Sequence, residues 1–446
     1  MQFPVFPTAF RKRCFLLSGG IFVLLLLFSL PLRGQLSGGG EANPDLHTNR
    51  AMLERWQSSR FGMFIHWGPV TLRGTEIGWS RGTSVPVTDY DSLYKEFNPV
   101  LFDADEWVRI ASGAGMKYMV LVTKHHDGFC LWPSDPTGYD IAATPYGKDI
   151  VGPLAEACRG KGLLFGTYYS ILDWWHPLYP LSHGNAPKDT AKTDMTKYTE
   201  YLYRQVDELL TRYHPDILWF DGQWEKPWTH EAGMTLYAHI RNIRDDILIN
   251  NRVDKGKVSG SPDAARYAGD FLTPEQTIGR YDLKNPWESC MTIGTQWSWK
   301  PNDRIRSRHE ILEMLARSAG GNGNLLLNVS PMPDGRIERR VQKRLAEVGE
   351  WLERYGHAIY GTRGGPWPPD SLLASTRDDE HIYLLLYGQG NDQVDLPYPA
   401  KAKIRQVSWL NGPTLPWKKE NGRLKITLEG PFPDPDVSVV AIRLKE

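Results

Sequence analysis

The feature that most constrains the fold of this 446-residue chain is a series of seven short apolar runs separated by helical patterns. Runs that are apolar at almost every position are typical of strands covered on both faces, as in a parallel sheet. They predict strands at 60–68, 117–126, 162–170, 216–222, 246–252, 288–294 and 322–330. The intervening patterns predict helices at 103–115, 149–162, 192–213, 230–244, 306–320 and 338–356.

This alternation of strand and helix over about 300 residues predicts an α/β fold, a TIM-type (β/α)8-like barrel that can be irregular. A doubly wound open sheet is the alternative, but the first predicted strand is not followed by the glycine-rich phosphate loop typical of such folds. We therefore expect one barrel domain over residues 50–361.

The composition changes near residue 361, where the Gly/Pro-rich segment GTRGGPWPPD begins. Beyond it, short alternating runs such as HIYLLLYG and RLKITLEG are separated by turn residues at regular spacing. This pattern is typical of all-β domains. We predict a small C-terminal all-β sandwich domain over residues 366–446.

The N-terminus has the order of a secretory signal, because Arg11, Lys12 and Arg13 precede the apolar run CFLLSGGIFVLLLLFSLPL. We predict a signal peptide over residues 1–34 and a flexible linker over residues 35–49. An uncleaved single-span anchor is the alternative, although the run is short for crossing a bilayer. In both cases we expect the rest of the chain to be exported. If the signal is removed, we expect a secreted or periplasmic protein with no stable membrane insertion.

Charge and cysteine content exclude some classes of partner and site. The 52 basic residues balance the 52 acidic ones, so we expect no nucleic-acid partner. Three of the four cysteines lie beyond the predicted signal and form no CxxC motif, which excludes a disulfide scaffold and a cysteine zinc site. The 17 tryptophans indicate either a large aromatic core or flat surfaces that stack on sugar rings or bases.

Polar and aromatic side chains mark the ends of six predicted strands, at the edge where a barrel of this kind forms its active site. A single residue of this sort is often structural, whereas six converging strand ends indicate a site. In strand order, the residues are His66, then His125 and His126, then Tyr168, then Trp219 and Asp221, then Arg252, and finally Asn328.

Three kinds of chemistry fit such an edge to different degrees. A metal hydrolase usually needs His-x-His on the first strand, whereas this chain has only His66 there. The neighbours His125 and His126 also point to opposite faces of an extended strand. A serine nucleophile is weaker still, because no G-x-S-x-G motif occurs. A glycoside hydrolase needs two carboxylates, neutral hydrogen-bonding groups and aromatic walls, and Asp221 is its candidate nucleophile because Gly222 after it lets substrate approach.

These motifs, read in order, resemble glycoside hydrolase family 29, the α-L-fucosidases, over roughly residues 50–361. The string KHHDGFCLW is highly specific. The other matching stretches are RFGMFIHWG, GLLFGTYYSILDWW, DILWFDG, NNR, WESCMTIG and GGNGNLLLNVSPMPDG. The resemblance implies a retaining exo-hydrolase that acts on a fucosylated carbohydrate and uses neither a metal nor an organic cofactor.

The resemblance also implies roles for individual residues. It makes Asp221 the nucleophile, and it implies substrate contacts for His66, His125, His126, Tyr168, Trp219 and Arg252. Trp219 or Trp297 would form an apolar wall for the methyl group of fucose. A further sugar-contacting segment of the family is altered here to RGTEIGWSRGTSVPVTDY, in which Glu76 and Trp79 are the candidates for its role.

Two carboxyl groups fit the acid/base of the family, whose position varies among members. Glu275 is preferred, because it lies in a loop after the fifth strand, where the family's acid commonly lies. Glu288, beside Trp287 at the start of a predicted strand, is the alternative acid/base or a buried structural acid. Retaining enzymes place their two carboxyl groups about 5–5.5 Å apart, and we expect this of Asp221 and Glu275.

The sequence thus predicts an exo-α-L-fucosidase that removes terminal α-L-fucosyl residues from oligosaccharides or glycoconjugates by double displacement. A non-catalytic carbohydrate-binding barrel is one alternative. The same machinery acting on a related sugar, such as an α-L-galactoside, is another. The motifs do not specify the linkage, the aglycone or the oligomeric state.

Overall fold

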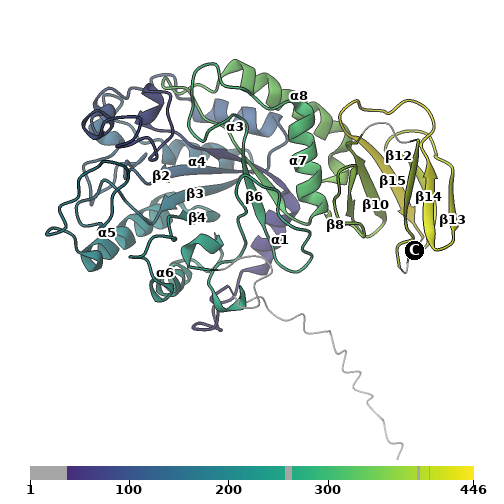
Figure 1. Ribbon diagram of the computed structural model, residues 1–446, viewed down its shortest axis with the longest axis horizontal. Helices are drawn as coiled ribbons and strands as arrows, with labels where there is room; N and C mark the ends of the chain where they lie inside the picture. Colours follow the sequence, from purple (N-terminus) through teal and green to yellow (C-terminus); the bar gives the residue numbers. More distant parts are fainter. Residues whose placement is uncertain (1–37, 257–263, 389–391, 401, 446) are drawn as a thin grey trace, which may run out of the picture. The chain divides into compact units, whose positions relative to one another are not determined.

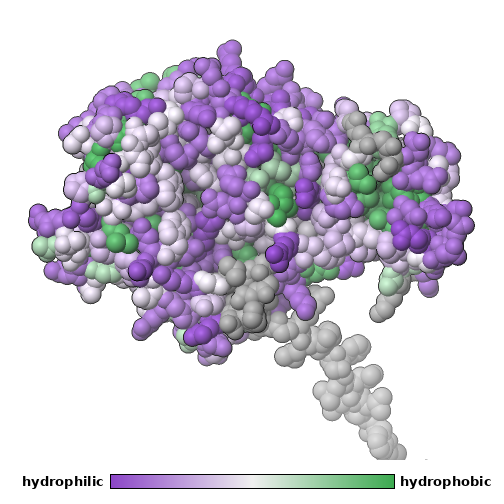
Figure 2. All heavy atoms as spheres, viewed as in Figure 1, coloured by the Kyte–Doolittle hydropathy of each residue, from purple (hydrophilic) through white to green (hydrophobic). Residues whose placement is uncertain are grey.

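The computed structural model describes residues 38–256, 264–388, 392–400 and 402–445 (Figure 1). The predicted signal peptide, residues 1–34, lies outside the described residues. Among the helices of the described part, none is long and apolar enough to cross a bilayer. In the view of Figure 2 the surface is mostly hydrophilic, with small apolar areas between the polar ones.

The larger domain is built on a sheet of seven parallel strands in the order β5-β4-β3-β2-β1-β7-β6 (Figure 1). The strands are β1 (Phe61–Ile65), β2 (Tyr118–Lys124), β3 (Leu164–Ser170), β4 (Ile217–Asp221), β5 (Leu248–Ile249), β6 (Glu288–Thr292) and β7 (Asn324–Asn328). All seven predicted strands are therefore confirmed. Every residue in them is buried, and this covering of both faces explains the continuous apolar runs in the sequence.

Residues 271–275 fill the space between β5 and β6 and make the barrel irregular. Three isolated parallel bridges join this segment to its neighbours: Asn250–Phe271, Leu272–Trp287 and Glu275–Cys290. The segment thus takes the place of an eighth strand without the length of one. Its position matters for function, because its last residue, Glu275, reaches the same end of the barrel as the strand ends.

Helices connect the strands and pack on the outside of the sheet (Figure 1). The α-helices are α1 (Arg50–Ser59), α2 (Val87–Tyr90), α3 (Ala104–Gly113), α4 (Val151–Gly160), α5 (Met195–Glu208), α6 (His230–Ile243), α7 (Arg308–Gly320) and α8 (Arg339–Tyr355). The six predicted helices correspond to α3–α8. Side-chain caps fix the starts of some of them: Asp103 accepts a hydrogen bond from the Glu106 amide in α3, and Ser307 forms a capping box with Glu310 in α7.

Helix α1, which the sequence patterns did not predict, closes the N-terminal end of the barrel. Its Trp56 packs against Phe271 with ring centroids 4.5 Å apart. The preceding residues 38–49, part of the segment predicted as a flexible linker, also contact the barrel. Thr48 is buried and donates a 2.7 Å hydrogen bond to Asp270, and the Gly269 amide donates to the Gly38 carbonyl.

The C-terminal residues form two antiparallel sheets with an apolar core between them, which confirms the predicted β-sandwich class. One sheet has the order β12-β15-β10-β9-β8 and the other β11-β14-β13. The strands are β8 (Arg363–Gly364), β9 (Leu373–Arg377), β10 (His381–Leu386), β11 (Gln393–Pro397), β12 (Ile404–Trp409), β13 (Trp417–Glu420), β14 (Arg423–Thr427) and β15 (Ser438–Leu444). Leu384, Leu424 and Val440 lie in the core.

Helices α7 and α8 make several of the contacts between the barrel and the sandwich (Figure 1). Arg308 at the start of α7 pairs with Asp434 at 2.8 Å and with Asp436 at 2.6 Å. The Trp351 indole of α8 donates to the Val437 carbonyl at 2.8 Å. These contacts join the sandwich to the outer helices, away from the strand ends that form the site.

Candidate active site

A pocket with about 430 Å³ of empty space, part of it open to solvent, lies at the C-terminal ends of the barrel strands. All predicted site residues except Glu76, Glu288 and Asn328 line it. The lining residues are Phe64, His66, Trp79, His125, His126, Tyr168, Trp219, Asp221, Trp224, Arg252, Glu275, Cys290 and Trp297. The pocket therefore assembles side chains that are up to 233 positions apart in the sequence, from Phe64 to Trp297.

Asp221 ends β4 with both carboxylate oxygens held in place. Tyr168 donates its hydroxyl to Oδ2 at 3.0 Å, and Arg252 donates Nη1 to Oδ1 at 2.8 Å. Gly222 then turns the chain with φ +86°, where an added Cβ would lie 2.8 Å from Leu172. A fixed carboxylate next to a sharp turn suits an attacking group, because its direction is set before substrate binds.

Arg252 connects Asp221 to Glu275. Its Nη2 atom lies 2.9 Å from Glu275 Oε2, while Nε and Nη2 also donate to the hydroxyl and carbonyl of Thr273. The guanidinium lies 4.7 Å from the ring centroid of Trp219. Burial opposes the charged form, but Asp221 and Glu275 outweigh it and raise the pKa of Arg252 above its usual range. The two carboxylates are thus within the span of one guanidinium.

Glu288 lies beneath the floor of the pocket rather than in it. It is 1% exposed, and it accepts hydrogen bonds from the Tyr118 hydroxyl at 2.5 Å and from the Trp219 indole at 3.1 Å. Burial raises its pKa to about 7. Trp219 separates Glu288 from the pocket, so of the two candidate acids only Glu275 has access to a bound sugar.

His66 and His126 are held so that each presents Nε2 to the pocket as an acceptor. His66 Nδ1 lies 2.7 Å from Asn328 Oδ1, and the Asn328 amide nitrogen donates to the Trp297 carbonyl. His126 Nδ1 lies 2.7 Å from Ser170 Oγ, whose proton goes to the Leu172 carbonyl. Since both partners accept, each Nδ1 carries the proton and each Nε2 is free to accept from a hydroxyl.

The three histidines of the pocket are neutral. Burial lowers the pKa of His66 to about 4. Burial, together with the neighbouring histidines, lowers the pKa of His125 well below its usual value, and the pKa of His126 falls in the same way. Neutral imidazoles can bind hydroxyl groups without attracting a counter-ion, which agrees with the predicted role of these residues.

Aromatic rings form the walls and the mouth of the pocket. Trp297 lies 4.7 Å from the His66 ring, and Trp219 stacks on Tyr168 at 5.4 Å. At the mouth, Trp79 and Trp224 are 39% and 45% exposed and nearly parallel, with an interplanar angle of 13°. Exposed tryptophans of this kind are typical of surfaces that stack on ligands.

Sequence reasoning missed Phe64, Trp224 and Cys290 as lining residues. Trp224 could have been predicted from the sequence, because it follows Asp221, the last residue of a strand, by three positions. Glu76 was predicted to contact substrate, but its two carboxylate oxygens accept from the Trp297 amide at 2.9 and 3.1 Å. It holds the wall from behind, and burial raises its pKa to about 7.

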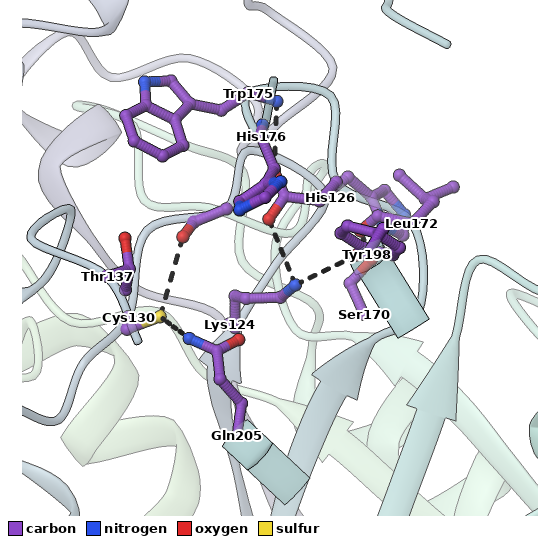
Figure 3. Close-up of polar contacts among 12 residues, drawn as sticks. Lys124, His126, Cys130, Thr137, Ser170, Leu172, Trp175, His176, Tyr198 and Gln205 are labelled. Carbon is purple, nitrogen blue, oxygen red and sulfur yellow. Dashed lines mark hydrogen bonds and ion pairs between the residues drawn. The ribbon is translucent and has the colours of Figure 1, made fainter. Parts of the chain in front are cut away.

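A buried ion pair supports the inner wall of the pocket. Lys124, at the end of β2, lies 3.2 Å from Asp173, and both side chains are fully buried. Figure 3 shows Lys124 pointing toward the Tyr198 hydroxyl, with His126 and Ser170 close by. Asp173 also accepts from the amides of Trp175 and His176. The pair therefore fixes the loop after β3 against the strand that carries His125 and His126.

The fold and the site define a class: a (β/α) barrel whose strand ends bring two carboxylates, neutral histidines and aromatic walls into one pocket, as glycoside hydrolases do. Within the described residues, no group of three or more His, Cys, Asp or Glu side chains is arranged to hold a metal ion.

The comparisons with known proteins agree with this class. The family model described as Alpha-L-fucosidase matches residues 39–357. The chain is 30% identical to the tissue alpha-L-fucosidase of Mus musculus over 81% of this chain and 84% of that protein. It is 31% identical to the tissue alpha-L-fucosidase of Homo sapiens over 80% of this chain and 81% of that protein. The chain belongs to the α-L-fucosidase family, glycoside hydrolase family 29.

Solved structures of the family share the fold. Alpha-L-fucosidase isoenzyme 1 from Paenibacillus thiaminolyticus aligns with a TM-score of 0.80 at 32% identity, over 89% of this chain and 99% of that one. An α-L-fucosidase from Bacteroides thetaiotaomicron, trapped as a covalent intermediate with 2-fluoro-fucosyl fluoride, aligns with a TM-score of 0.80 at 26% identity, over 90% and 97% of the two chains.

Proposed function

We propose that the protein is a retaining exo-α-L-fucosidase that removes terminal α-L-fucosyl residues from oligosaccharides or glycoconjugates. The observation that carries the proposal is the pair Asp221 and Glu275, which face one pocket and are bridged by Arg252. A pocket with a buried floor suits the terminal residue of a chain. The covalent intermediate trapped in the Bacteroides relative supports a double displacement.

In the first half of the reaction, Asp221 attacks the anomeric carbon while Glu275 protonates the departing glycosidic oxygen. The bond to the aglycone breaks, and a fucosyl ester forms on Asp221. Glu275, having given its proton to the leaving group, is now a carboxylate. In the second half, Glu275 takes a proton from water, the water oxygen attacks the anomeric carbon, and Asp221 is released.

The remaining pocket residues bind the sugar. The Nε2 atoms of His66 and His126 accept hydrogen bonds from sugar hydroxyls. Phe64 and Trp297 form an apolar surface that suits the methyl group of fucose. An α-L-galactoside would place an extra hydroxyl in that position and leave it without a partner, so we expect it to be a poorer substrate.

The proposal is tested by assaying Asp221→Ala and Glu275→Ala on a fucoside with an activated leaving group. Loss of Asp221 is expected to abolish turnover. Loss of Glu275 is expected to be partly rescued by azide, with a fucosyl azide as product. The matched variant is Glu288→Gln, and if it shows the rescue instead, the acid assignment is wrong. Failure of the wild-type protein to turn over any fucoside would favour a carbohydrate-binding barrel.

We further propose that the chain is exported through its N-terminal signal. The proposal is supported by the basic residues Arg11, Lys12 and Arg13 before an apolar run. Cell fractionation and N-terminal sequencing of the native protein test it. A mature N-terminus near residue 35 is expected, whereas an intact Met1 in the membrane fraction would indicate the anchor instead.

A further inference from the structure

A second cavity lies beside the catalytic pocket, and we call it the flanking cavity. It holds about 700 Å³ of empty space, part of which is open to solvent. Trp297 lines both spaces, and Gln276, which lines the flanking cavity, directly follows Glu275 of the catalytic pocket. A leaving group that is protonated by Glu275 therefore starts next to this cavity, and the sugar beyond the fucosyl group can extend into it.

The flanking cavity contains a cation without a carboxylate partner of its own. Arg306 is half-buried and donates Nε to the Thr292 carbonyl at 2.7 Å, and within the described residues no carboxylate lies within ion-pair distance of it. Arg304, which also lines the cavity, pairs with Glu310 at 2.7 Å. The other oxygen of Glu310 accepts from the Ser307 amide at 2.6 Å. Both oxygens of Glu310 are therefore occupied, one by Arg304 and the other by the Ser307 amide.

The remaining charged groups around the cavity do not neutralise Arg306. Lys300 and Asp303 pair with each other at 3.4 Å. Glu76 is the acidic residue among the lining residues, and its oxygens are occupied by the Trp297 amide. Burial raises the pKa of Glu76 to about 7, which reduces its negative charge near neutral pH. The cavity is consequently biased toward anions.

The backbone at Gln276 gives a second, independent indication of a binding site. Its φ is +50°, a left-handed conformation that is unfavourable for a residue with a side chain. The conformation is held by a hydrogen bond from its amide to the Cys290 carbonyl at 3.0 Å and by its side chain, whose amide donates to Thr292 at 3.3 Å. Strain of this kind concentrates at ligand-binding positions. This conformation places the side-chain amide of Gln276 in the lining of the cavity, which Arg306 also lines.

We propose that the flanking cavity binds an anionic substituent, a sulfate ester or a carboxylate, on the sugar to which the fucosyl group is attached. Both groups are planar or compact oxyanions that match a guanidinium, and Gln276 adds a neutral donor. The proposal rests on the proposed fucosidase function and extends it to the class of substrate. It makes the protein selective for acidic fucosylated glycans.

The test compares matched substrates that differ only in this substituent. Fucosyl disaccharides with a neutral acceptor, the same acceptor sulfated, and the same acceptor carrying a carboxylate are assayed for kcat/KM. The wild-type protein is expected to prefer at least one anionic acceptor. Arg306→Gln is expected to reduce that preference about tenfold, the effect of one lost hydrogen bond to a charged group. Arg306→Lys should restore part of it, and the preference should weaken with added salt.

Arg109→Gln serves as the matched control, because Arg109 lies on α3 in an exposed pair with Glu106. Its ratio of anionic to neutral kcat/KM is expected to equal that of the wild type. The inference is overturned if the wild type does not prefer an anionic acceptor. It is also overturned if Arg306→Gln lowers kcat/KM by the same factor for all three substrates. Turnover of the neutral substrate separates this result from failure of the fucosidase function itself, in which no fucoside is cleaved.

Discussion

Arg252 lies 2.8 Å from Asp221, and its second nitrogen reaches Glu275 at 2.9 Å. One cation therefore links the proposed nucleophile and the proposed acid/base, which come from different segments of the barrel. The guanidinium fork sets their mutual position, and each carboxylate receives its own N–H. A point charge at the same place would neutralise the carboxylates but would not fix the geometry.

Arg252→Lys is accordingly expected to lower kcat/KM for an aryl fucoside by about 10²–10³, the cost of losing a preorganised polar contact at a reacting centre. The loss should appear mainly in kcat. Arg244→Lys is the control, because Arg244 pairs with Asp246 outside the pocket. Thermal unfolding shows whether the variants are folded. Activity of Arg252→Lys at the wild-type level would mean that charge alone is sufficient.

The buried carboxyl group of Glu288 leads to a prediction of how the free energy of unfolding depends on pH. Its folded-state pKa is raised to about 7 from an unfolded value near 4.5. The stabilisation by the protonated group is thus complete below about pH 4.5 and is lost as pH rises through 7. Glu288→Gln stays neutral throughout. Relative to this variant, the wild type should lose about 1.4 kcal/mol of unfolding free energy per pH unit within that window.

Urea unfolding of both proteins at several pH values measures this difference. Glu76, whose pKa is also raised to about 7, is present in both proteins and cancels in the comparison. A constant difference between pH 4.5 and 7 would show that Glu288 is ionised in the folded protein. Such a result would also weaken the view that it only supports Trp219 and Tyr118 beneath the pocket.

Much of the site follows from strand position alone. Tyr168 and Asp221 could be placed on the rim because each lies at or near the end of an apolar run, and parallel barrel strands all end on one side. The same argument applies to His66 and His126. Such a pattern depends only on the residues of one strand. The end of each strand can therefore be predicted without knowing which strands are its neighbours.

Other parts of the site depend on contacts that no local pattern reports. Residues 271–275 close the barrel through isolated bridges, and Pro274 interrupts any strand pattern, so the access of Glu275 to the pocket could not be derived from periodicity. The resemblance already favoured Glu275 over Glu288, but the physical reason, the burial of Glu288 under Trp219, is visible only in the structure. Glu76 was expected to face the sugar, but a backbone amide more than two hundred residues away takes its carboxylate.

The buried pair of Lys124 and Asp173 leads to a third prediction. Lys124→Met leaves Asp173 charged and unpaired in the interior, and we expect a loss of about 3–5 kcal/mol in unfolding free energy. Adding Asp173→Asn removes that charge and keeps an acceptor for the Trp175 and His176 amides, so the double variant should recover part of the loss. Urea unfolding measures both. Equal stability of the single and double variants would show that the pair has no coupling.

The orientation of His66 gives the last prediction. Asn328 and Ser330 both donate to the Trp297 carbonyl, but only Asn328 also accepts from His66. Asn328→Ala is therefore expected to free the imidazole and to lower kcat/KM for a fucoside by about ten- to a hundredfold, whereas Ser330→Ala should cost much less. With the wild type, methylating the sugar hydroxyl that contacts His66 should lower kcat/KM by about the same factor as the Asn328→Ala substitution does. With Asn328→Ala, the same methylation should lower kcat/KM only slightly further. If the two alanine variants lose equal activity, the asparagine acts through Trp297 rather than through the histidine.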